Sequence, residues 1–333
     1  MARSDPKPTA VADIKAQVLS ASLLAAVEVG LFARLRRAPA PVEDLLSELG
    51  LERSVGSAWL QVLRAGGYLA CRSGLLALTE RARPLAADGP VISWAKEMAL
   101  FGRALTDLPS LLRGGAATSS ALGDFWAYKR AGAAVGEGAA AAYSATMDES
   151  QERHAHAVLG LWDFGGYRRI ADLGGGYGGF ARRLVERYPG LDVVVVDLPA
   201  VVATAPAGPA GVRFLAADLF TDELEEGFDC AIFNRVLHDW SDPEAVTLLA
   251  KARSLVVSGG EVIVAEKLAP EADLDLDQAA TALMLVLLGG ARRSAARYSE
   301  LMAEAGLVVE AVIGTSEGPA AVVVGRPAER GRD

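Results

Sequence analysis

The residues with the clearest chemical potential form a glycine-rich segment after a short apolar run. Residues 170 to 179 are Ile-Ala-Asp-Leu-Gly-Gly-Gly-Tyr-Gly-Gly, so Asp172 lies near the end of an expected strand and five glycines follow among residues 174 to 179. Glycine adopts positive φ and has no Cβ, so a ligand can approach the backbone here. The helix expected from Phe180 points free N–H groups at the same place. The segment therefore predicts a site for a nucleotide-like ligand.

The charge of Asp172 distinguishes between two classes of ligand. Gly174, Gly176 and Gly179 satisfy the G-x-G-x-x-G pattern of dinucleotide sites. An aspartate at this strand end would repel a pyrophosphate, whereas it attracts the ammonium and sulfonium of S-adenosylmethionine. The carboxylate therefore favours S-adenosylmethionine as the cofactor, and a dinucleotide is the less favoured interpretation.

Two later strand ends carry carboxylates that suit the same cofactor. The valines at 193 to 196 indicate a buried strand, and Asp197 follows them about 20 residues after the glycines, where an acidic residue binds ribose hydroxyls. A nicotinamide enzyme would meet the same spacing, so Asp197 indicates the fold and not the cofactor. A strand expected over 212 to 216 leads to Asp218 and Leu219, a carboxylate for the adenine amine and an apolar contact for its ring. The remaining candidates for cofactor contacts are Gly176, Leu198 and Asn234.

His238 is the candidate for proton transfer, after a strand expected over 228 to 233. The sulfonium methyl is already a strong electrophile, so the protein must place an acceptor oxygen in line with it and remove one proton. Transfer from a phenol of pKa about 10 to an imidazole of pKa about 6.5 is uphill by roughly 5 kcal/mol in water. A carboxylate such as Glu266, at the next strand's end, would raise the basicity of His238 and fix its tautomer. A core or capping role is the alternative for His238, and a surface ion pair is the alternative for Glu266.

These motifs together resemble one family, the S-adenosylmethionine-dependent O-methyltransferases of plant phenolics and bacterial secondary metabolites. The carrying segments, in the family's order and spacing, are Asp172-Leu-Gly-Gly-Gly-Tyr-Gly, Val196-Asp197-Leu-Pro199, Ala217-Asp218-Leu-Phe220, Leu237-His238-Asp239-Trp240-Ser-Asp242 and Val262-Ile-Val-Ala-Glu266. The resemblance spans nearly the whole chain. It implies a general base at His238, a residue that steadies its imidazole at Glu266, and cofactor contacts from Gly174, Asp197, Asp218 and Leu219.

One position departs from that family. Where the family usually has Gly-Gly-Lys-Glu-Arg-Thr, this chain has Gly289-Gly290-Ala291-Arg292-Arg293-Ser294, so Arg292 replaces a second carboxylate beside the base. Three interpretations stay open: His238 works with Glu266 alone, Arg292 or Arg293 binds an anionic group of the substrate, or proton removal is not the chemistry. Both arginines are equally compatible with a solvated loop, since exposed charge is the default.

The expected elements divide the chain into three stretches. Residues 11 to 90 show helical spacing and then a hairpin, and the resemblance implies a mainly helical, winged-helix-like dimerisation domain there. Residues 91 to 160 are expected to form a helical linker or substrate cap. Residues 161 to 327 are expected to form an α/β catalytic domain that binds S-adenosylmethionine. Its Rossmann-like, mostly parallel sheet should end in an antiparallel edge made by late strands over 308 to 313 and 320 to 325.

The middle stretch is rich in aromatic residues and methionine, which favours an aromatic acceptor, although a helix core explains any one of them more simply. The substrate candidates are Trp94, Phe125, Trp126, Met147, Asp239 and Arg292. The expected reaction is methyl transfer to a phenolic hydroxyl of a small aromatic or polyketide-type metabolite. Methylation on carbon, or a non-methylating use of the cofactor, is the alternative that the departure at Arg292 keeps open.

Composition limits the other classes. The net charge of −9 disfavours nucleic acid, and the candidate DNA-reading helix over 54 to 69 is apolar, so a ligand-responsive regulator is the less favoured hypothesis. No stretch approaches the roughly 20 apolar residues of a membrane span, so we expect no membrane contact and a cytoplasmic location. Cys71 and Cys230 have no metal or redox spacing. His154 and His156 should project to different faces of a helix as surface residues and not as a metal pair; no metal is expected.

Overall fold

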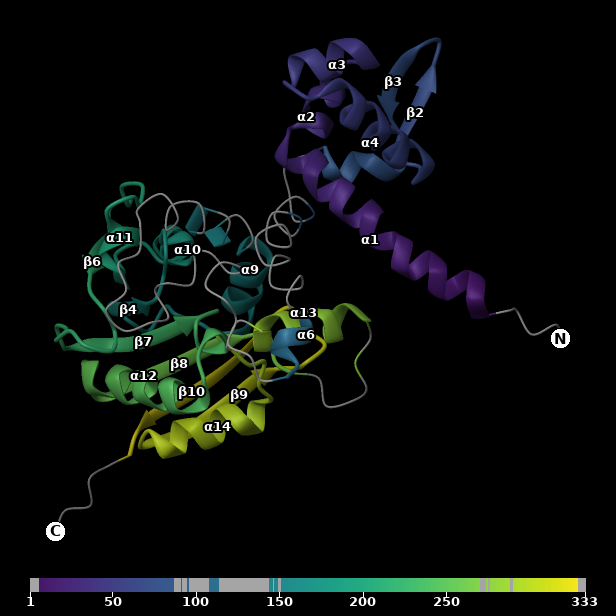
Figure 1. Ribbon diagram of the computed structural model, residues 1–333. Helices are drawn as coiled ribbons and strands as arrows, with labels where there is room; N and C mark the ends of the chain where they lie inside the picture. Colours follow the sequence, from purple (N-terminus) through teal and green to yellow (C-terminus); the bar gives the residue numbers. More distant parts are fainter. Residues whose placement is uncertain are drawn as a thin grey trace. The chain divides into compact units, whose positions relative to one another are not determined.

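The computed structural model describes residues 6–86, 91, 95, 108–113, 144–145, 147–148, 151–269, 274, 276–287 and 290–328. The chain forms two compact units, Met1–Arg103 and Ala104–Asp333, which are drawn in Figure 1. Most of the expected helical cap over 91 to 160 lies outside the described residues. The division into three stretches therefore stays a prediction.

The first unit is a set of helices followed by a small antiparallel sheet. Its helices are α1 (Pro6–Glu28), α2 (Leu31–Arg37), α3 (Val42–Glu48), α4 (Arg53–Ala65) and the 3-10 helix η1 (Glu80–Leu85), and its strands are β1 (Ala40–Pro41), β2 (Leu69–Arg72) and β3 (Leu75–Leu78). The strand order is β1-β3-β2, and β2 pairs antiparallel with β3, as the hairpin prediction requires. Ser73 and Gly74 turn the chain with φ of 51° and 79°. The helices bury apolar side chains such as Leu31, Leu45 and Leu63 against this sheet.

No single helix in the described ranges is both long and apolar enough to cross a membrane. One bent pair, Lys15–Glu28 with Leu31–Arg37 at 63°, meets that test only by joint length and composition. In the second helix of the pair Leu31, Phe32 and Leu35 are buried in the core of the first unit.

The second unit contains a seven-stranded sheet in the order β6-β5-β4-β7-β8-β10-β9. Its strands are β4 (Arg169–Leu173), β5 (Asp192–Asp197), β6 (Val212–Ala216), β7 (Phe228–Asn234), β8 (Val256–Glu266), β9 (Leu307–Gly314) and β10 (Ala321–Pro327). Strands β4 to β8 pair parallel, whereas β10 pairs antiparallel with both β8 and β9. The predicted mostly parallel sheet with an antiparallel edge is confirmed.

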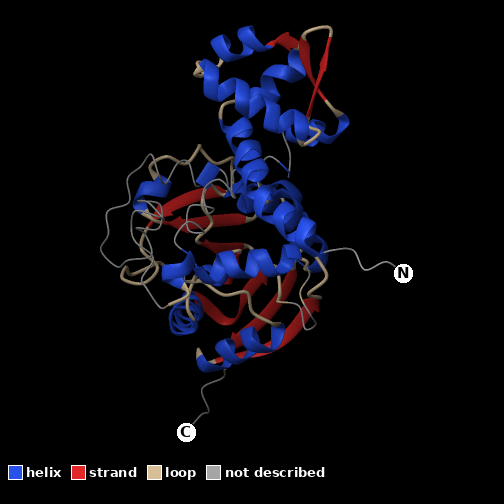
Figure 2. Ribbon diagram, turned by 45° about the vertical axis from the view of Figure 1, so that its right-hand side comes forward, coloured by secondary structure: helices blue, strands red, loops and turns tan. Residues whose placement is uncertain are grey.

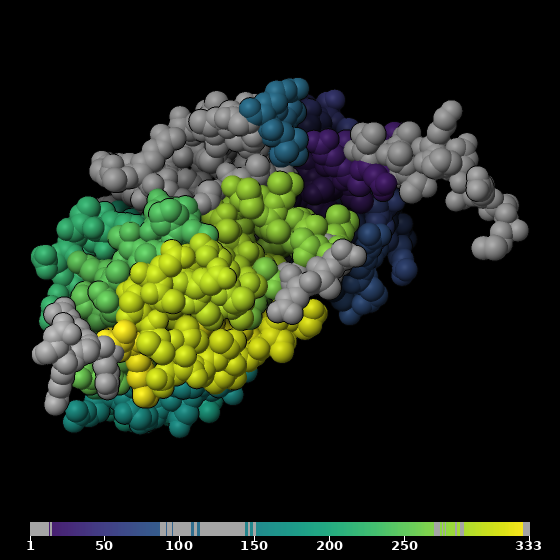
Figure 3. All heavy atoms as spheres, turned by 90° about the horizontal axis from the view of Figure 1, so that it is seen from below, coloured from purple at the N-terminus to yellow at the C-terminus, as the bar shows by residue number. Residues whose placement is uncertain are grey.

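Helices cover both faces of this sheet, as Figure 2 shows. The helices of this unit are α6 (Leu108–Leu111), α9 (Glu152–Leu161), α10 (Gly179–Arg187), α11 (Pro199–Val202), α12 (Asp242–Leu255), α13 (Leu276–Leu287) and α14 (Ala295–Glu304), with the 3-10 helix η4 (Leu237–Asp239). In β5, Val193 and Val195 are buried with α9 and α10, while Val194 and Val196 are buried with α12 and α14. Burial on both faces is the reason that β5 is a continuous run of valines. In Figure 3 the residues of α14, β9 and β10 form one continuous yellow surface.

The strand order places the carboxyl end of β4 at a switch point. The chain runs from β4 outward to β5 and β6, and then returns to β7 on the other side of β4. The loops after β4 and β7 therefore diverge and leave a crevice at the carboxyl ends of the strands, where ligands bind in open α/β sheets.

His154 corrects one expectation. It was expected on the surface, but it is 7% exposed, on the side of α9 that packs on the sheet, and its Nδ1 lies 3.1 Å from the carbonyl oxygen of Pro319. Burial, followed by the charge of Arg235, lowers the pKa of His154 to about 4. His156 is exposed, as expected. Within the described ranges, no three His, Cys, Asp or Glu side chains are arranged to hold a metal ion.

Candidate active site

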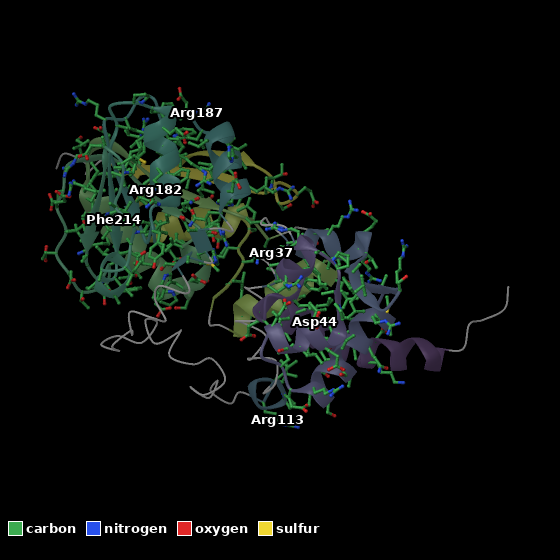
Figure 4. All side chains as sticks on the ribbon, turned by 90° about the horizontal axis from the view of Figure 1, so that it is seen from above. Arg37, Asp44, Arg113, Arg182, Arg187 and Phe214 are labelled. Atoms are coloured by element: carbon green, nitrogen blue, oxygen red, sulfur yellow. The ribbon has the colours of Figure 1, made fainter. Side chains whose placement is uncertain are left out.

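The glycine-rich loop between β4 and α10 has a shape that only glycine tolerates well. Gly174, Gly176 and Gly178 have φ of 72°, 58° and 73°. No atom lies within 4 Å of the position where a Cβ on Gly176 would stand, so this part of the loop opens onto free space. At Gly178 the same atom would lie 3.1 Å from the ring of Phe214, a β6 residue labelled in Figure 4 with Arg182 and Arg187 of α10. The loop thus presents bare backbone on one side and packs on β6 on the other.

Asp197 holds this loop in place. Its Oδ2 accepts a hydrogen bond of 2.7 Å from the N–H of Gly176, and its Oδ1 accepts one of 2.7 Å from the N–H of Leu198. Burial raises the pKa of Asp197, and these two N–H donors oppose that effect. The side chain remains partly exposed at the crevice, so lone pairs of the carboxylate are available to hydroxyl donors.

Asp172 is fully buried behind the loop. Neither carboxylate oxygen has a hydrogen-bond partner among the described residues, and a Cβ on Gly175 would lie 2.6 Å from Oδ2. Burial, followed by the charge of Asp197, raises the pKa of Asp172 to about 7. Asp172 does not belong to the pocket wall described below, so the glycine loop separates its carboxylate from that space. A buried acid without a partner suits a cationic ligand close by, which agrees with the positive charges of S-adenosylmethionine.

A pocket opens at the carboxyl ends of β4 to β7, with about 1140 Å³ of empty space that includes its mouth to solvent. The predicted cofactor contacts that line it are Gly174, Gly176, Asp197, Leu198, Asp218, Leu219 and Asn234. The predicted base His238 and the substrate candidates Met147 and Asp239 line it too. Segments far apart in the sequence thus meet around one space large enough for a cofactor.

His238 and Glu266 form a buried pair at this pocket. The imidazole Nδ1–H donates to Oε2 of Glu266 at 2.8 Å, and the side chains are 19% and 2% exposed. Oε1 of Glu266 accepts from the N–H of Val236 at 3.0 Å and from that of His238 at 3.3 Å. The carboxylate therefore sets both the tautomer of the ring and the position of its backbone.

The charges around His238 shift its acid strength. Burial opposes protonation of the ring, but the carboxylates of Glu266 and Asp239 outweigh burial, so the pKa of His238 is raised. Burial likewise disfavours an ionised Glu266, but the charge and hydrogen bond of His238 outweigh it, so the pKa of Glu266 is lowered. Oδ1 of Asp239 lies 3.7 Å from Nε2. A second carboxylate thus lies beside the ring even though Arg292 occupies the position where the resembled family has one.

Arg293 departs from both expectations for it. It was expected in a solvated loop or against the substrate, but it is 4% exposed and bonds with Asp242 and the backbone of Leu237 and Trp240. Arg292 is half-buried and is not among the described residues that line the pocket. Its role toward the substrate stays a prediction. The candidates Trp94, Phe125 and Trp126 lie outside the described residues.

Sequence reasoning missed several residues of the pocket wall as site residues. They include Ser144, Gln151, Arg235 and Trp240. Arg235 has φ of 60°, which is uncommon for a residue other than glycine, and its N–H donates to the carbonyl oxygen of Ala265 at 3.0 Å. The rings of Phe220 and Trp240 pack edge to face, with their centroids 4.8 Å apart. Arg235 and Trp240 had one signal, their place in the segment after β7, whereas no motif pointed to Ser144 or Gln151.

The sheet with helices on both faces, the glycine loop and the carboxylates at the carboxyl ends of β4, β5 and β6 define an α/β enzyme of the class that binds S-adenosylmethionine. A family model described as "O-methyltransferase domain" matches residues 123–308. The chain therefore belongs to the O-methyltransferase family.

Individual relatives agree with this assignment. The chain is 33% identical over 304 residues to demethylspheroidene O-methyltransferase of Cereibacter sphaeroides, covering 86% of this chain and 77% of that protein. It is 36% identical over 172 residues to 3-hydroxy-5-methyl-1-naphthoate 3-O-methyltransferase of Streptomyces sahachiroi, about half of each chain (49% and 50%). Human N-acetylserotonin methyltransferase, solved in complex with S-adenosylmethionine, superimposes with a TM-score of 0.79 at 25% identity, covering 98% of this chain and 100% of that one.

The chain is an S-adenosylmethionine-dependent O-methyltransferase. The prediction of the family, the fold, the cofactor and the reaction is confirmed. The alternatives of carbon methylation, a non-methylating reaction or a DNA-binding regulator are not favoured.

Proposed function

We propose that this enzyme methylates a phenolic hydroxyl of a small aromatic or polyketide-type secondary metabolite, with His238 as the general base. The observation that carries the proposal is the hydrogen bond of 2.8 Å between Nδ1 of His238 and Oε2 of Glu266, because the His238 side chain lines the pocket. With Nδ1–H held by the carboxylate, Nε2 carries the lone pair that accepts the proton of the acceptor. The naphthoate methyltransferase of Streptomyces sahachiroi, by its name, acts on a hydroxylated aromatic acid, which favours this class of acceptor.

The proposed proton transfer follows from the charges around the imidazole of His238. The bound cofactor supplies an electrophilic methyl group. As the acceptor oxygen forms its bond to that carbon and the carbon–sulfur bond breaks, the acceptor proton moves to Nε2 of His238. The imidazolium that results lies between Glu266 at 2.8 Å and Asp239 at 3.7 Å, so two carboxylates stabilise it. This stabilisation reduces the unfavourable difference in pKa between imidazole and phenol.

Different residues of the same pocket are expected to bind different parts of the cofactor. Asp197 is proposed to accept hydrogen bonds from the ribose hydroxyls, and Asp218 to accept from the adenine amine. Leu219 and the neighbouring Phe220 and Trp240 pair offer apolar surface to the adenine ring. The open side of the glycine loop would adjoin the methionine part of the cofactor, with the charge of Asp172 behind it.

Two further proposals concern the assembled protein. We expect a homodimer through the N-terminal domain, and exposed apolar side chains there, Val18 at 57% and Val55 at 70%, support a face that a partner would cover. Light scattering at micromolar concentration should give twice the mass of 34.7 kDa. A cytoplasmic location stays an expectation from the isolated cysteines in the sequence.

Mass spectrometry tests the reaction. Purified protein is incubated with S-adenosylmethionine and a panel of hydroxylated naphthoates and related phenols, and a product heavier by one methylene is expected with the methyl on oxygen. His238→Gln should lower kcat by about 10²- to 10⁴-fold. His156→Gln, at an exposed histidine, is the matched control and should retain wild-type kcat. Near-normal turnover by His238→Gln would remove His238 from the role of base, and fragments with the methyl on carbon would overturn the reaction class.

A further inference from the structure

The turn that carries His238 is held from several sides. Glu266 at the end of β8 binds the backbone N–H groups of Val236 and His238. On the other side of the turn, Ser241 caps α12 through a capping box with Glu244, whose Oε2 accepts from the N–H of Ser241 at 2.9 Å. These contacts fix the two ends of the turn. Neither contact reaches the carbonyl groups of the turn.

Those carbonyl groups are bound by Arg293. Its Nη1 donates to the carbonyl oxygen of Leu237 at 2.8 Å and its Nη2 to that of Trp240 at 2.6 Å, one on each side of His238 and Asp239. Its Nε donates to Oδ1 of Asp242 at 2.7 Å. A buried guanidinium is stable only when it is paired and hydrogen-bonded, and here three of its nitrogens are.

The chain next to Arg293 packs on the same turn. The N–H of Ala291 donates to the carbonyl oxygen of His238 at 2.8 Å. A Cβ on Gly290 would clash with that same oxygen, so only glycine allows this approach. The segment from 290 to 293 thus satisfies the carbonyl groups of Leu237, His238 and Trp240 in one place.

We propose that Arg293 is a positioning residue for methyl transfer: it fixes the backbone on both sides of His238 so that the imidazole stays on Glu266 and faces the acceptor. This inference rests on the proposed function, because it matters for turnover only if His238 takes the proton. Lysine cannot replace the fork of arginine here, since a single ammonium cannot reach two carbonyl groups and a carboxylate in a plane.

The charged groups around the imidazole of His238 set its pKa, so a measurement of that pKa can test the role of Arg293. Among the described residues they are Glu266 from β8, Asp239 and Arg235 from the strand-end segment, and His154 from α9. Loosening the turn weakens the bond to Glu266, so the pKa of His238 should fall in Arg293→Lys and Arg293→Met. Simple loss of a nearby positive charge in Arg293→Met would raise that pKa instead. The two explanations therefore predict opposite directions.

Arg297→Gln is the matched control. Arg297 also pairs with Asp242, at 2.9 Å, but its side chain is 36% exposed against 3% for Arg293, and it bonds to Glu300 instead of to the turn. We expect Arg293→Lys to lower kcat by about 10- to 100-fold, and Arg297→Gln to change it by less than about threefold. The Kd for S-adenosylmethionine should stay within about threefold in both, because the glycine loop and Asp197 are untouched.

The imidazole resonances give a readout that does not depend on activity. The chain has 3 histidines, so histidine labelled with ¹⁵N gives few signals, and His238→Gln and His156→Gln assign them. A lower His238 pKa in both Arg293 variants, with Arg297→Gln like wild type, supports the inference. An unchanged or raised pKa in both, or equal kcat in Arg293→Lys and Arg297→Gln, overturns it. If Arg293→Met does not fold, Arg293→Lys and Asp242→Asn, which removes the negative charge that pairs with the guanidinium, decide the question.

Failure of the proposed function looks different. If His238→Gln keeps its turnover, the base assignment is wrong, yet the resonances still report whether Arg293 positions the ring. If His238→Gln is inactive and the Arg293 variants leave the His238 pKa and kcat unchanged, the positioning inference alone is wrong.

Discussion

Nδ1 of His238 lies 2.8 Å from Oε2 of Glu266, while Oε1 of the same carboxylate binds the backbone N–H of His238 at 3.3 Å. The buried side chain of Glu266 thus binds both the imidazole ring and the backbone N–H of His238. This double contact joins the end of β8 to the segment after β7, two adjacent parallel strands.

Replacing Glu266 should move the pH profile in a defined direction. Glu266→Gln keeps an amide oxygen to accept from the N–H groups but removes the charge that favours a protonated ring. The pKa of His238 is raised in the wild type, so the acid limb of kcat against pH should shift to lower pH in the variant, and the plateau should fall by about 10- to 100-fold. Steady-state rates from pH 5 to 9 measure both effects. A limb that stays in place would mean that the profile reports a different group.

Asp172→Asn should stabilise the enzyme free of cofactor at pH 8. The folded-state pKa of about 7 lies above the ordinary value of 3.8, so the native protein holds a proton that the unfolded chain has lost. Stability therefore falls as pH rises from about 4 to 7, and the cost is complete above 7. Removing the acid should raise the free energy of unfolding at pH 8 by about 1 to 3 kcal/mol, since the amide keeps part of the burial cost. Urea titration at pH 5 and pH 8 tests this, and equal gains at both pH values would argue against the mechanism.

The same substitution should weaken cofactor binding. A cationic ligand beside Asp172 favours its ionised form, so S-adenosylmethionine should bind more tightly as pH rises from 5 to 8, with proton release near pH 7. Calorimetry in two buffers of different ionisation enthalpy measures the protons released. Asp172→Asn should abolish that release and raise Kd by about 10- to 100-fold. Wild-type binding that is independent of pH would contradict the charge argument.

Gly176→Ala should separate backbone strain from occupation of the cofactor space. Gly176 and Gly50 have φ of 58° and 66°, and each has open space where a Cβ would stand. Alanine should therefore cost each variant about 1 to 2 kcal/mol of stability. Only Gly176→Ala should raise the Kd for S-adenosylmethionine, by more than about tenfold, because Gly50 lies in the other unit. Equal Kd values in the two variants would place the cofactor elsewhere.

His154→Gln should make the protein more resistant to acid. The pKa of about 4 in the folded state lies below the ordinary 6.5, so the unfolded chain binds the extra proton and the native state loses stability as pH falls from about 6.5 to 4. A full shift of this size corresponds to about 3 kcal/mol at the lower end. Glutamine stays neutral and can still donate to the carbonyl oxygen of Pro319. Melting temperatures at pH 5 and 8 should differ less in His154→Gln than in wild type or in the exposed control His156→Gln.

Local sequence patterns predicted most of the fold. The valines of β5, the glycines after β4 and the spacing of apolar residues in the late strands are properties of neighbouring residues, and each predicted an element that the structure contains. The carboxyl-end rule for parallel sheets then brought Asp197, Asp218 and His238 to one edge before any distance was known.

What the sequence determined alone is the chemistry available: a glycine loop, acids at strand ends and one histidine placed for proton transfer. The tertiary structure decided which groups are buried and with which partners. Burial depends on packing between segments that are far apart in the chain. No local pattern therefore shows that Arg293 is buried and bonded to the backbone near His238, whereas its neighbour Arg292 is half-buried. Nor does a local pattern show that His154 is buried instead of exposed. The same long-range packing leaves Asp172 without a hydrogen-bond partner among the described residues, and that is the physical reason we expect its charge to favour a cationic cofactor.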